Sequence, residues 1–171
     1  MDTIRVLTIS DDRALVASIE EMLTAPGVTP RYQVDVVTGF QNALRNLVSD
    51  SHDIFLLDYI VPGAGITGIE LIQRAQAGGC TSPIILLTQL MDESVHWAAQ
   101  MAGAADVLHK QLDLCPHPDC PLNRNTDMPR RVLLRAIRYA TQHYQQLQGI
   151  QKQLNSVQEQ LVSVHKKLNR S

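Results

Sequence analysis

The sequence is poor in aromatic residues, in cysteine and in any excess of charge, and each shortage excludes a class of protein. Phe, Trp and Tyr make up 4% of the 171 residues, and the 15 Lys and Arg do not outnumber the 17 acidic residues. Binding of nucleic acid relies on a basic surface and on stacking, so we expect no nucleic-acid partner. The three cysteines are too few for a disulfide framework, and a reducing cytoplasm is the expected location.

Long hydrophobic runs are also missing. No apolar run approaches the roughly 18 residues that a membrane helix requires. The N-terminus, MDTIRVLTIS, carries an acid and lacks the long apolar segment of a signal peptide. We therefore expect no membrane association. Hydrophobic residues still make up 44% of the chain, enough to bury a core.

Short apolar runs alternate with amphipathic segments up to residue 110. The predicted strands are 4–9, 32–37, 53–58, 83–88 and 105–110, and the predicted helices are 14–23, 40–48, 69–77 and 92–102. Near-continuous apolar strands are typical of a parallel sheet that is buried on both faces. The predicted fold class is α/β, an open doubly wound sheet of five parallel strands. Such sheets place their sites outside the carboxyl ends of the strands.

The pattern changes beyond residue 110. Residues 111–129, QLDLCPHPDCPLNRNTDMP, contain four prolines and are predicted to form an irregular insert. The 40 residues from 130 to 169 contain no proline and predict one long helix. We therefore predict a first domain over 1–145, insert included, and a C-terminal helix over 146–171.

The C-terminal helix carries an apolar seam. Its members recur at alternating steps of three and four, the heptad spacing of a coiled coil: Leu147, Ile150, Leu154, Val157, Leu161, Val164 and Leu168. The seam is about 33 Å long at 1.5 Å per residue, and a polar helix has no core of its own, so a partner helix is expected. Leucine occupies heptad position a, and β-branched residues occupy position d. In parallel coiled coils this arrangement disfavours a strictly two-stranded assembly. A frayed linker, given Gly149, is the alternative.

Three glycines raise the question of a dinucleotide site. Gly63, Gly65 and Gly68 follow the spacing G-x-G-x-x-G within DYIVPGAGITG. A dinucleotide fold needs that loop after its first strand, where pyrophosphate meets a helix N-terminus. Here two acids follow the first strand, and Thr88 stands where a ribose-binding acid is expected. We interpret the glycine loop as a flexible turn.

Chemically active residues stand where the predicted strands end. They are Ser10, Asp11 and Asp12 after the first strand, Asp58 on the third, Thr88 on the fourth and Lys110 on the fifth. The carboxyl ends of parallel strands share one edge, so these side chains are expected to gather. Mg²⁺ binds one or two carboxylates plus waters, and a carboxylate nucleophile can accept a phosphoryl group. An amine and a hydroxyl nearby would contact the phosphoryl oxygens.

The segments ISDD, FLLDYIVPG, ILLT and AGAADVLHK resemble the receiver domain of two-component response regulators. The resemblance covers about residues 3–110, and Arg131–Tyr144 resembles the fifth helix of such domains. It implies a flavodoxin-like fold and phosphorylation of Asp58. It also implies a Mg²⁺ site made of Asp11, Asp12, Asp58 and the backbone carbonyl of Ile60.

The resemblance extends to the switch residues and the partners. Thr88 would be the switch hydroxyl and Lys110 the lysine that binds the phosphoryl group. Gln111 stands where the family usually has proline, and KQL is similar to receivers fused to sensor kinases. A histidine kinase or phosphotransfer protein would supply the phosphoryl group, and the domain itself would not be an enzyme. A homodimer would form through the fourth and fifth helices and the C-terminal helix, which would carry the signal.

Other interpretations of the same residues stay open. The strand-end acids could simply cap helices. The domain could also be a phosphorylation-independent receiver-like dimerisation or adaptor module. A haloacid-dehalogenase-like phosphatase is rejected, because it needs a second acid two residues after the nucleophile, where Ile60 stands.

The insert contains a candidate metal site. Cys115, His117 and Cys120 lie within CPHPDC and offer ligands that suit Zn²⁺. A structural site needs four ligands, and His109 or His143 could complete it only by folding back. A Cys115–Cys120 disulfide, or a proline-stiffened loop with incidental thiols, are the alternatives.

Overall fold

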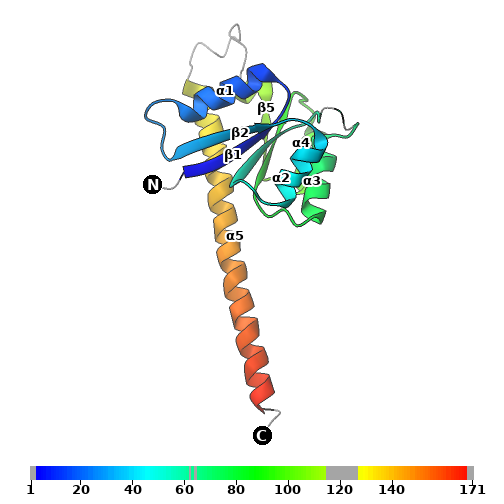
Figure 1. Ribbon diagram of the computed structural model, residues 1–171, viewed down its shortest axis with the longest axis vertical. Coiled ribbons are helices and arrows are strands. Elements are labelled where there is room, and N and C mark those ends of the chain that lie inside the picture. The colour runs from blue at the N-terminus through cyan, green and yellow to red at the C-terminus, as the bar shows by residue number, and fades with distance from the viewer. Residues whose placement is uncertain (1–2, 62, 64, 115–126, 169–171) are drawn as a thin grey trace. The chain divides into compact units, whose positions relative to one another are not determined.

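A computed structural model describes residues 3–61, 63, 65–114 and 127–168 (Figure 1). Strands and helices alternate along the chain. The strands are β1 (Thr3–Ile9), β2 (Arg31–Val37), β3 (Ile54–Asp58), β4 (Ile84–Thr88) and β5 (Asp106–His109). The helices are α1 (Arg13–Thr24), α2 (Phe40–Val48), α3 (Gly68–Ala77), α4 (Glu93–Ala102), the π-helix η1 (Lys110–Leu114) and α5 (Asp127–Leu168).

The five strands form one sheet in the order β2-β1-β3-β4-β5, and every neighbouring pair is parallel. This is the flavodoxin-like order, which reverses between β1 and β3, and it confirms the predicted fold class. Ile9 lies opposite Leu57, and Thr88 lies opposite His109. The register therefore brings the residue after Ile9 beside Asp58 at the carboxyl edge of the sheet.

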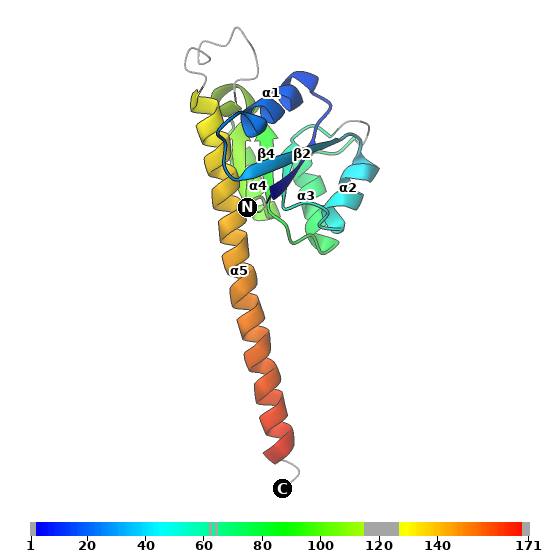
Figure 2. The ribbon, with the colours of Figure 1, turned by 60° about the vertical axis from the view of Figure 1, so that its left-hand side comes forward.

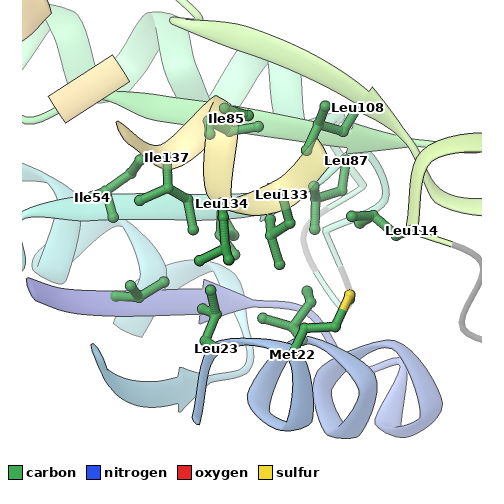
Figure 3. Packing of buried hydrophobic residues seen from close by; sticks show 14 of the residues in the cluster. Met22, Leu23, Ile54, Ile85, Leu87, Leu108, Leu114, Leu133, Leu134 and Ile137 are labelled. Atoms are coloured by element: carbon green, nitrogen blue, oxygen red, sulfur yellow. The ribbon is translucent and has the colours of Figure 1, made fainter. Parts of the chain in front are cut away.

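Each face of the sheet carries its own apolar core. Alternate side chains of β3 face opposite ways: Ile54 and Leu56 belong to one core and Phe55 and Leu57 to the other. The first core is closed by α1 and by the Leu133–Ala140 part of α5 (Figure 3). The second is closed by α2, α3 and α4, and Figure 2 shows α2 and α3 on the side of the sheet away from α1. Burial on both faces accounts for the continuous apolar runs of the central strands.

The start of α3 is fixed close to the end of β3. Thr67 and Glu70 form a reciprocal capping box at the helix N-terminus. The Gly68 N–H donates to the Tyr59 carbonyl at 2.6 Å, and a Cβ atom on Gly68 would lie 2.6 Å from the Asp58 carbonyl oxygen. Gly63 and Gly65 do adopt positive φ angles in the loop. The interpretation as a flexible turn is wrong for Gly68, which permits close packing of helix on strand.

The structure corrects the prediction for residues 105–129 at three points. Strand β5 ends at His109, so Lys110 opens η1 and is not the last strand residue. Residues 111–114 belong to η1, and α5 already begins at Asp127 with Pro129 in its first turn, where a proline is tolerated. Side chains stabilise the turn at η1, because the His109 N–H donates to Asp113 Oδ2 at 2.6 Å. Residues 115–126 lie outside the described part.

The chain divides into two compact units, Met1–Thr141 and Gln142–Ser171. The described part of the second unit is helical throughout, Gly149 included, which argues against a frayed linker. The predicted boundary at 145/146 stays a prediction. No helix in the described ranges is long and apolar enough to span a membrane.

Candidate functional site

Asp58 is the centre of a buried polar cluster at the carboxyl edge of the sheet. It ends β3 and is only 3% exposed. Its Oδ2 atom accepts hydrogen bonds from Lys110 Nζ at 2.5 Å and from Ser10 Oγ at 2.8 Å. Its Oδ1 atom accepts one from the Ile60 N–H at 3.2 Å. The carboxylate is therefore paired and held in one orientation by three separate segments.

Lys110 carries its charge into this cluster. The side chain is 6% exposed, and Nζ lies 2.5 Å from Asp58 Oδ2 and 4.0 Å from Asp12 Oδ2. A buried ammonium group is costly unless carboxylates compensate its charge. One amine thus draws together the acids that follow two different strands, as the sequence predicted for Asp12, Asp58 and Lys110.

The predicted acid pair is divided between two environments. Asp12 caps α1, since its Oδ1 atom accepts the Leu15 N–H at 3.1 Å while Oδ2 faces Lys110. The helix-cap interpretation is therefore correct for Asp12, and its role as a metal ligand stays a prediction. Asp11 is exposed and lines a groove of about 690 Å³ beside α1 and the residues after β2.

Thr88 is fully buried at the end of β4, and its Oγ1 atom accepts the Leu90 N–H at 3.0 Å. Within the described part of the chain, no hydrogen bond joins Thr88 to Asp58. Its hydroxyl instead fixes the segment between β4 and α4. The structure thus brings Asp12, Asp58 and Lys110 into one cluster, with Thr88 engaged next to it.

The carboxylate oxygens of this cluster are possible ligands for Mg²⁺. Among the described residues, no group of three or more His, Cys, Asp or Glu side chains is arranged to hold a metal ion. Mg²⁺ needs fewer protein ligands than that, usually one or two carboxylates with waters and other oxygens. Asp12 and Asp58 offer two carboxylates that face one ammonium group. The residues present fit Mg²⁺.

Two residues of this edge are missed by the sequence analysis. The sequence places Ser10 at a strand end without indicating a role, whereas in the structure its hydroxyl contacts Asp58. His109 links two loops: its Nε2 atom lies 2.9 Å from the Gln89 carbonyl oxygen, and its Nδ1 atom accepts the N–H groups of Gln111 and Leu112. Nδ1 is the acceptor, so Nε2 carries the proton that is donated to Gln89. Proline in place of Gln111 would remove one of these donors.

The zinc hypothesis is weakened by His109. Both of its ring nitrogens are engaged in hydrogen bonds, so His109 is not available to complete a zinc site. Cys115, His117 and Cys120, and with them the disulfide alternative, lie outside the described residues.

The comparison with protein families decides what kind of domain carries this cluster. A family model described as the response regulator receiver domain matches residues 6–115, more than half of the chain. The chain belongs to this family. The resemblance seen in the sequence is thereby confirmed, and this receiver domain is a module of two-component signalling.

Relatives and solved structures agree with this assignment. The response regulator MprA of Mycolicibacterium vanbaalenii is 32% identical over 111 residues, 65% of this chain and 46% of that protein. MprA of Mycobacterium tuberculosis is 31% identical over 112 residues, 66% of this chain and 46% of that protein. The receiver chain thus spans about half the length of the curated relatives it matches.

Among solved structures, the signal receiver domain of a modulated diguanylate cyclase from Desulfovibrio desulfuricans is similar with a TM-score of 0.62 and 26% identity, over 84% of this chain and 98% of that one. The response regulator domain of Thermotoga maritima CheB has a TM-score of 0.63 at 22% identity, over 82% and 98%. The second likeness supports the receiver fold alone.

Proposed function

We propose that this receiver domain accepts a phosphoryl group on Asp58, in a Mg²⁺-dependent reaction, from a histidine kinase or a phosphotransfer protein in the cytoplasm. The observation that carries the proposal is the buried Asp58 carboxylate, hydrogen-bonded to Lys110 Nζ at 2.5 Å. The same amine lies 4.0 Å from Asp12 Oδ2. A nucleophilic carboxylate, a compensating cation and a second acid for a metal ion are the components that transfer to a carboxylate requires.

Each residue has a chemical role in the proposal. A carboxylate oxygen of Asp58 attacks phosphorus, the bond between phosphorus and the donor breaks, and its electron pair stays with the donor. Lys110 compensates negative charge on the phosphoryl oxygens. Asp12, Asp58 and the Ile60 carbonyl would hold Mg²⁺, with Asp11 at the solvent side. When bound, Mg²⁺ neutralises charge on the transferring group.

The response begins at Thr88. In the structure its hydroxyl oxygen accepts the Leu90 N–H. A phosphoryl group on Asp58 offers new acceptor oxygens, so we expect the Thr88 hydroxyl to turn toward them and release Leu90. This would bias the packing of α4 and α5 between two arrangements.

The experiment is labelling with a radioactive small phosphodonor such as acetyl phosphate. We predict Mg²⁺-dependent uptake in the wild-type chain and none in Asp58→Asn. The control is Asp53→Asn, an exposed aspartate one residue before β3 that pairs with Arg5, and it should be labelled normally. Label that persists in Asp58→Asn would refute the assignment of the acceptor.

We further propose that the domain forms a homodimer. The seam residues of the C-terminal helix are all at least half exposed, from 50% at Leu154 to 69% at Leu168. Seven residues flank the seam at heptad positions e and g: the uncharged Gln146, Gln151, Gln153, Gln158 and Gln160, and in addition His165 and Lys167. Few charges therefore oppose the pairing of identical helices.

Exposed apolar side chains on α4 and on α5 offer further contacts for the dimer. Trp97 and Met101 lie one turn apart on α4 and are 66% and 69% exposed, and Tyr139 on α5 is 66% exposed. The alternative, an adaptor that works without phosphorylation, is not favoured by family membership. Measuring the oligomeric state with and without Mg²⁺ plus beryllofluoride separates the two, since only a phosphorylation-dependent switch responds.

A further inference from the structure

Ser10 occupies a position where a hydroxyl group can act directly on the phospho-acceptor. It is 1% exposed and follows the last residue of β1. Its Oγ atom donates to Asp58 Oδ2 at 2.8 Å and accepts the Asp12 N–H at 3.1 Å. The Asp12 N–H occupies an acceptor site of the hydroxyl, so the proton of Ser10 is directed at the carboxylate.

The fold determines this contact. Ile9 pairs with Leu57 in the parallel register, so the next residue of each strand lies at the same level of the sheet. Ser10 is thus held by β1, which is paired on both sides, and by the start of α1. The hydroxyl is a fixed donor and has little freedom to turn away.

We propose that Ser10 shortens the lifetime of the phosphorylated state by donating directly to the Asp58 carboxylate. The inference rests on the proposed phosphorylation of Asp58 and adds a residue that controls how long it lasts. A hydrogen bond to a charged carboxylate is roughly twice as strong as one to a neutral acceptor. Phosphorylation removes the charge of the carboxylate, so Ser10 stabilises the free Asp58 more than the acyl phosphate.

The same preference acts during hydrolysis. Water attacks phosphorus, the bond between phosphorus and the Asp58 oxygen breaks, and its electron pair returns to the carboxylate. The products are inorganic phosphate and a proton. Negative charge develops on the leaving carboxylate in the transition state, where the Ser10 donor strengthens its bond. Ser10 therefore favours both the loss of the phosphoryl group and the unphosphorylated state.

The test measures the half-life of the phosphoryl label after removal of excess acetyl phosphate, at fixed Mg²⁺. We expect Ser10→Ala to lengthen the half-life by about three- to tenfold, the effect of losing part of one charge-assisted hydrogen bond. Ser10→Cys, which is close in size but a weak donor, should lengthen it as well. Ser10→Thr keeps the hydroxyl and should stay near the wild-type value.

Thr8 provides the matched control. It lies two residues earlier on β1, is fully buried, and its hydroxyl has no hydrogen-bond partner among the residues that the structure describes. Thr8→Val should leave the half-life unchanged. The ¹³C chemical shift of the Asp58 carboxyl carbon, measured without phosphodonor, should move in Ser10→Ala and not in Thr8→Val, which reports the contact without any phosphorylation.

The outcomes separate this inference from the proposed function. A wild-type chain that takes up no label overturns the proposed function and the role of Ser10 with it. A labelled wild type, with half-lives in Ser10→Ala and Ser10→Cys within twofold of it, overturns the role of Ser10 alone. An equal change in Thr8→Val would also overturn it, because the effect would then belong to packing of β1.

Discussion

At the scale of single residues, Asp50 shows how one carboxylate can hold the residues that precede a strand, here β4. Asp50 follows α2 with a φ angle of 46°, and it accepts hydrogen bonds from Thr81 N and Ser82 N, each at 2.9 Å, and from Thr81 Oγ1 at 2.6 Å. Burial alone would raise the pKa of Asp50, but these hydrogen bonds outweigh it and lower the pKa below its usual value. The charged carboxylate thereby fixes the residues that lead into β4.

We predict that Asp50→Asn lowers the free energy of unfolding by about 1–2 kcal/mol at pH 7, since an amide nitrogen then faces backbone donors. Asparagine tolerates a positive φ, so the backbone is not the cause. A lowered pKa stabilises the fold above the ordinary aspartate pKa of about 4, and this contribution disappears as the pH falls through the lowered value. Urea unfolding should therefore show a gap between variant and wild type at pH 7 that closes toward pH 3. An equal gap at both pH values would refute the prediction.

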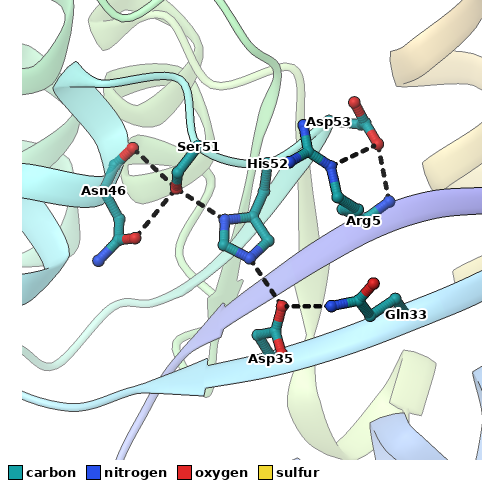
Figure 4. A network of polar contacts seen from close by, with 7 residues as sticks. All are labelled: Arg5, Gln33, Asp35, Asn46, Ser51, His52 and Asp53. Carbon is teal, nitrogen blue, oxygen red and sulfur yellow. Dashed lines mark hydrogen bonds and ion pairs between the residues drawn. The ribbon is translucent and has the colours of Figure 1, made fainter.

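His52 illustrates how a familiar residue order can be structural. Ser51 Oγ lies 2.7 Å from His52 Nδ1, and His52 Nε2 lies 3.0 Å from Asp35 Oδ2 (Figure 4). Ser, His and Asp in this sequence of contacts also form hydrolase triads. Here the serine hydroxyl donates its single proton toward Asn46, where it is shared between the backbone oxygen and Oδ1. The hydroxyl proton is therefore directed at α2 and not at His52, so Ser51 is not activated as a nucleophile, and it is His52 that extends the network to Asp35 of β2.

At the scale of elements, two glycines in helices have opposite environments. A Cβ atom on Gly68, at the start of α3, would approach the Asp58 carbonyl oxygen to 2.6 Å and Leu86 Cδ1 to 2.8 Å. Gly149 lies inside α5 with nothing within 4 Å of such an atom. The first glycine is required by packing, whereas the second only weakens its helix.

We predict that Gly68→Ala lowers the free energy of unfolding by about 1–3 kcal/mol, because either α3 or the end of β3 must move. Gly149→Ala is the matched control and should stabilise its helix by about 0.5–1 kcal/mol. Urea unfolding measures the first effect and far-UV circular dichroism the second. A neutral Gly68→Ala would mean that α3 is free to shift away from β3.

At the scale of the whole molecule, association through the C-terminal helix can be tested with two valines. Val157 lies on the seam and Val162 lies off it, and their exposed fractions are close, 51% and 54%. The same substitution at each position thus adds the same charge to the same helix, on the seam in one case and beside it in the other.

We predict that Val157→Glu weakens dimerisation at least about tenfold, because it places two charges face to face in an apolar contact. Val162→Glu should leave dimerisation unchanged. Sedimentation velocity at micromolar concentrations measures both. Equal behaviour of the two variants would show that the seam does not mediate association.

The sequence by itself determined the order of strands and helices and which polar residues stand at the ends of the central strands. Central strands that are buried on both faces must be apolar throughout, so the runs that contain Phe55 and Leu86 were visible without a structure. Asp58 and Lys110 were visible because a charged residue directly after an apolar run marks the end of a strand.

Only the tertiary structure decided what Ser10, His109 and Gly68 do. Their contacts join segments far apart in the chain, such as Ser10 with Asp58 and His109 with Gln89. Such contacts depend on strand register and on the distance between a helix and its strand, which no local pattern of residue types encodes. The double role of Asp12, as helix cap and partner of Lys110, likewise became visible only when its two oxygens could be assigned to different neighbours.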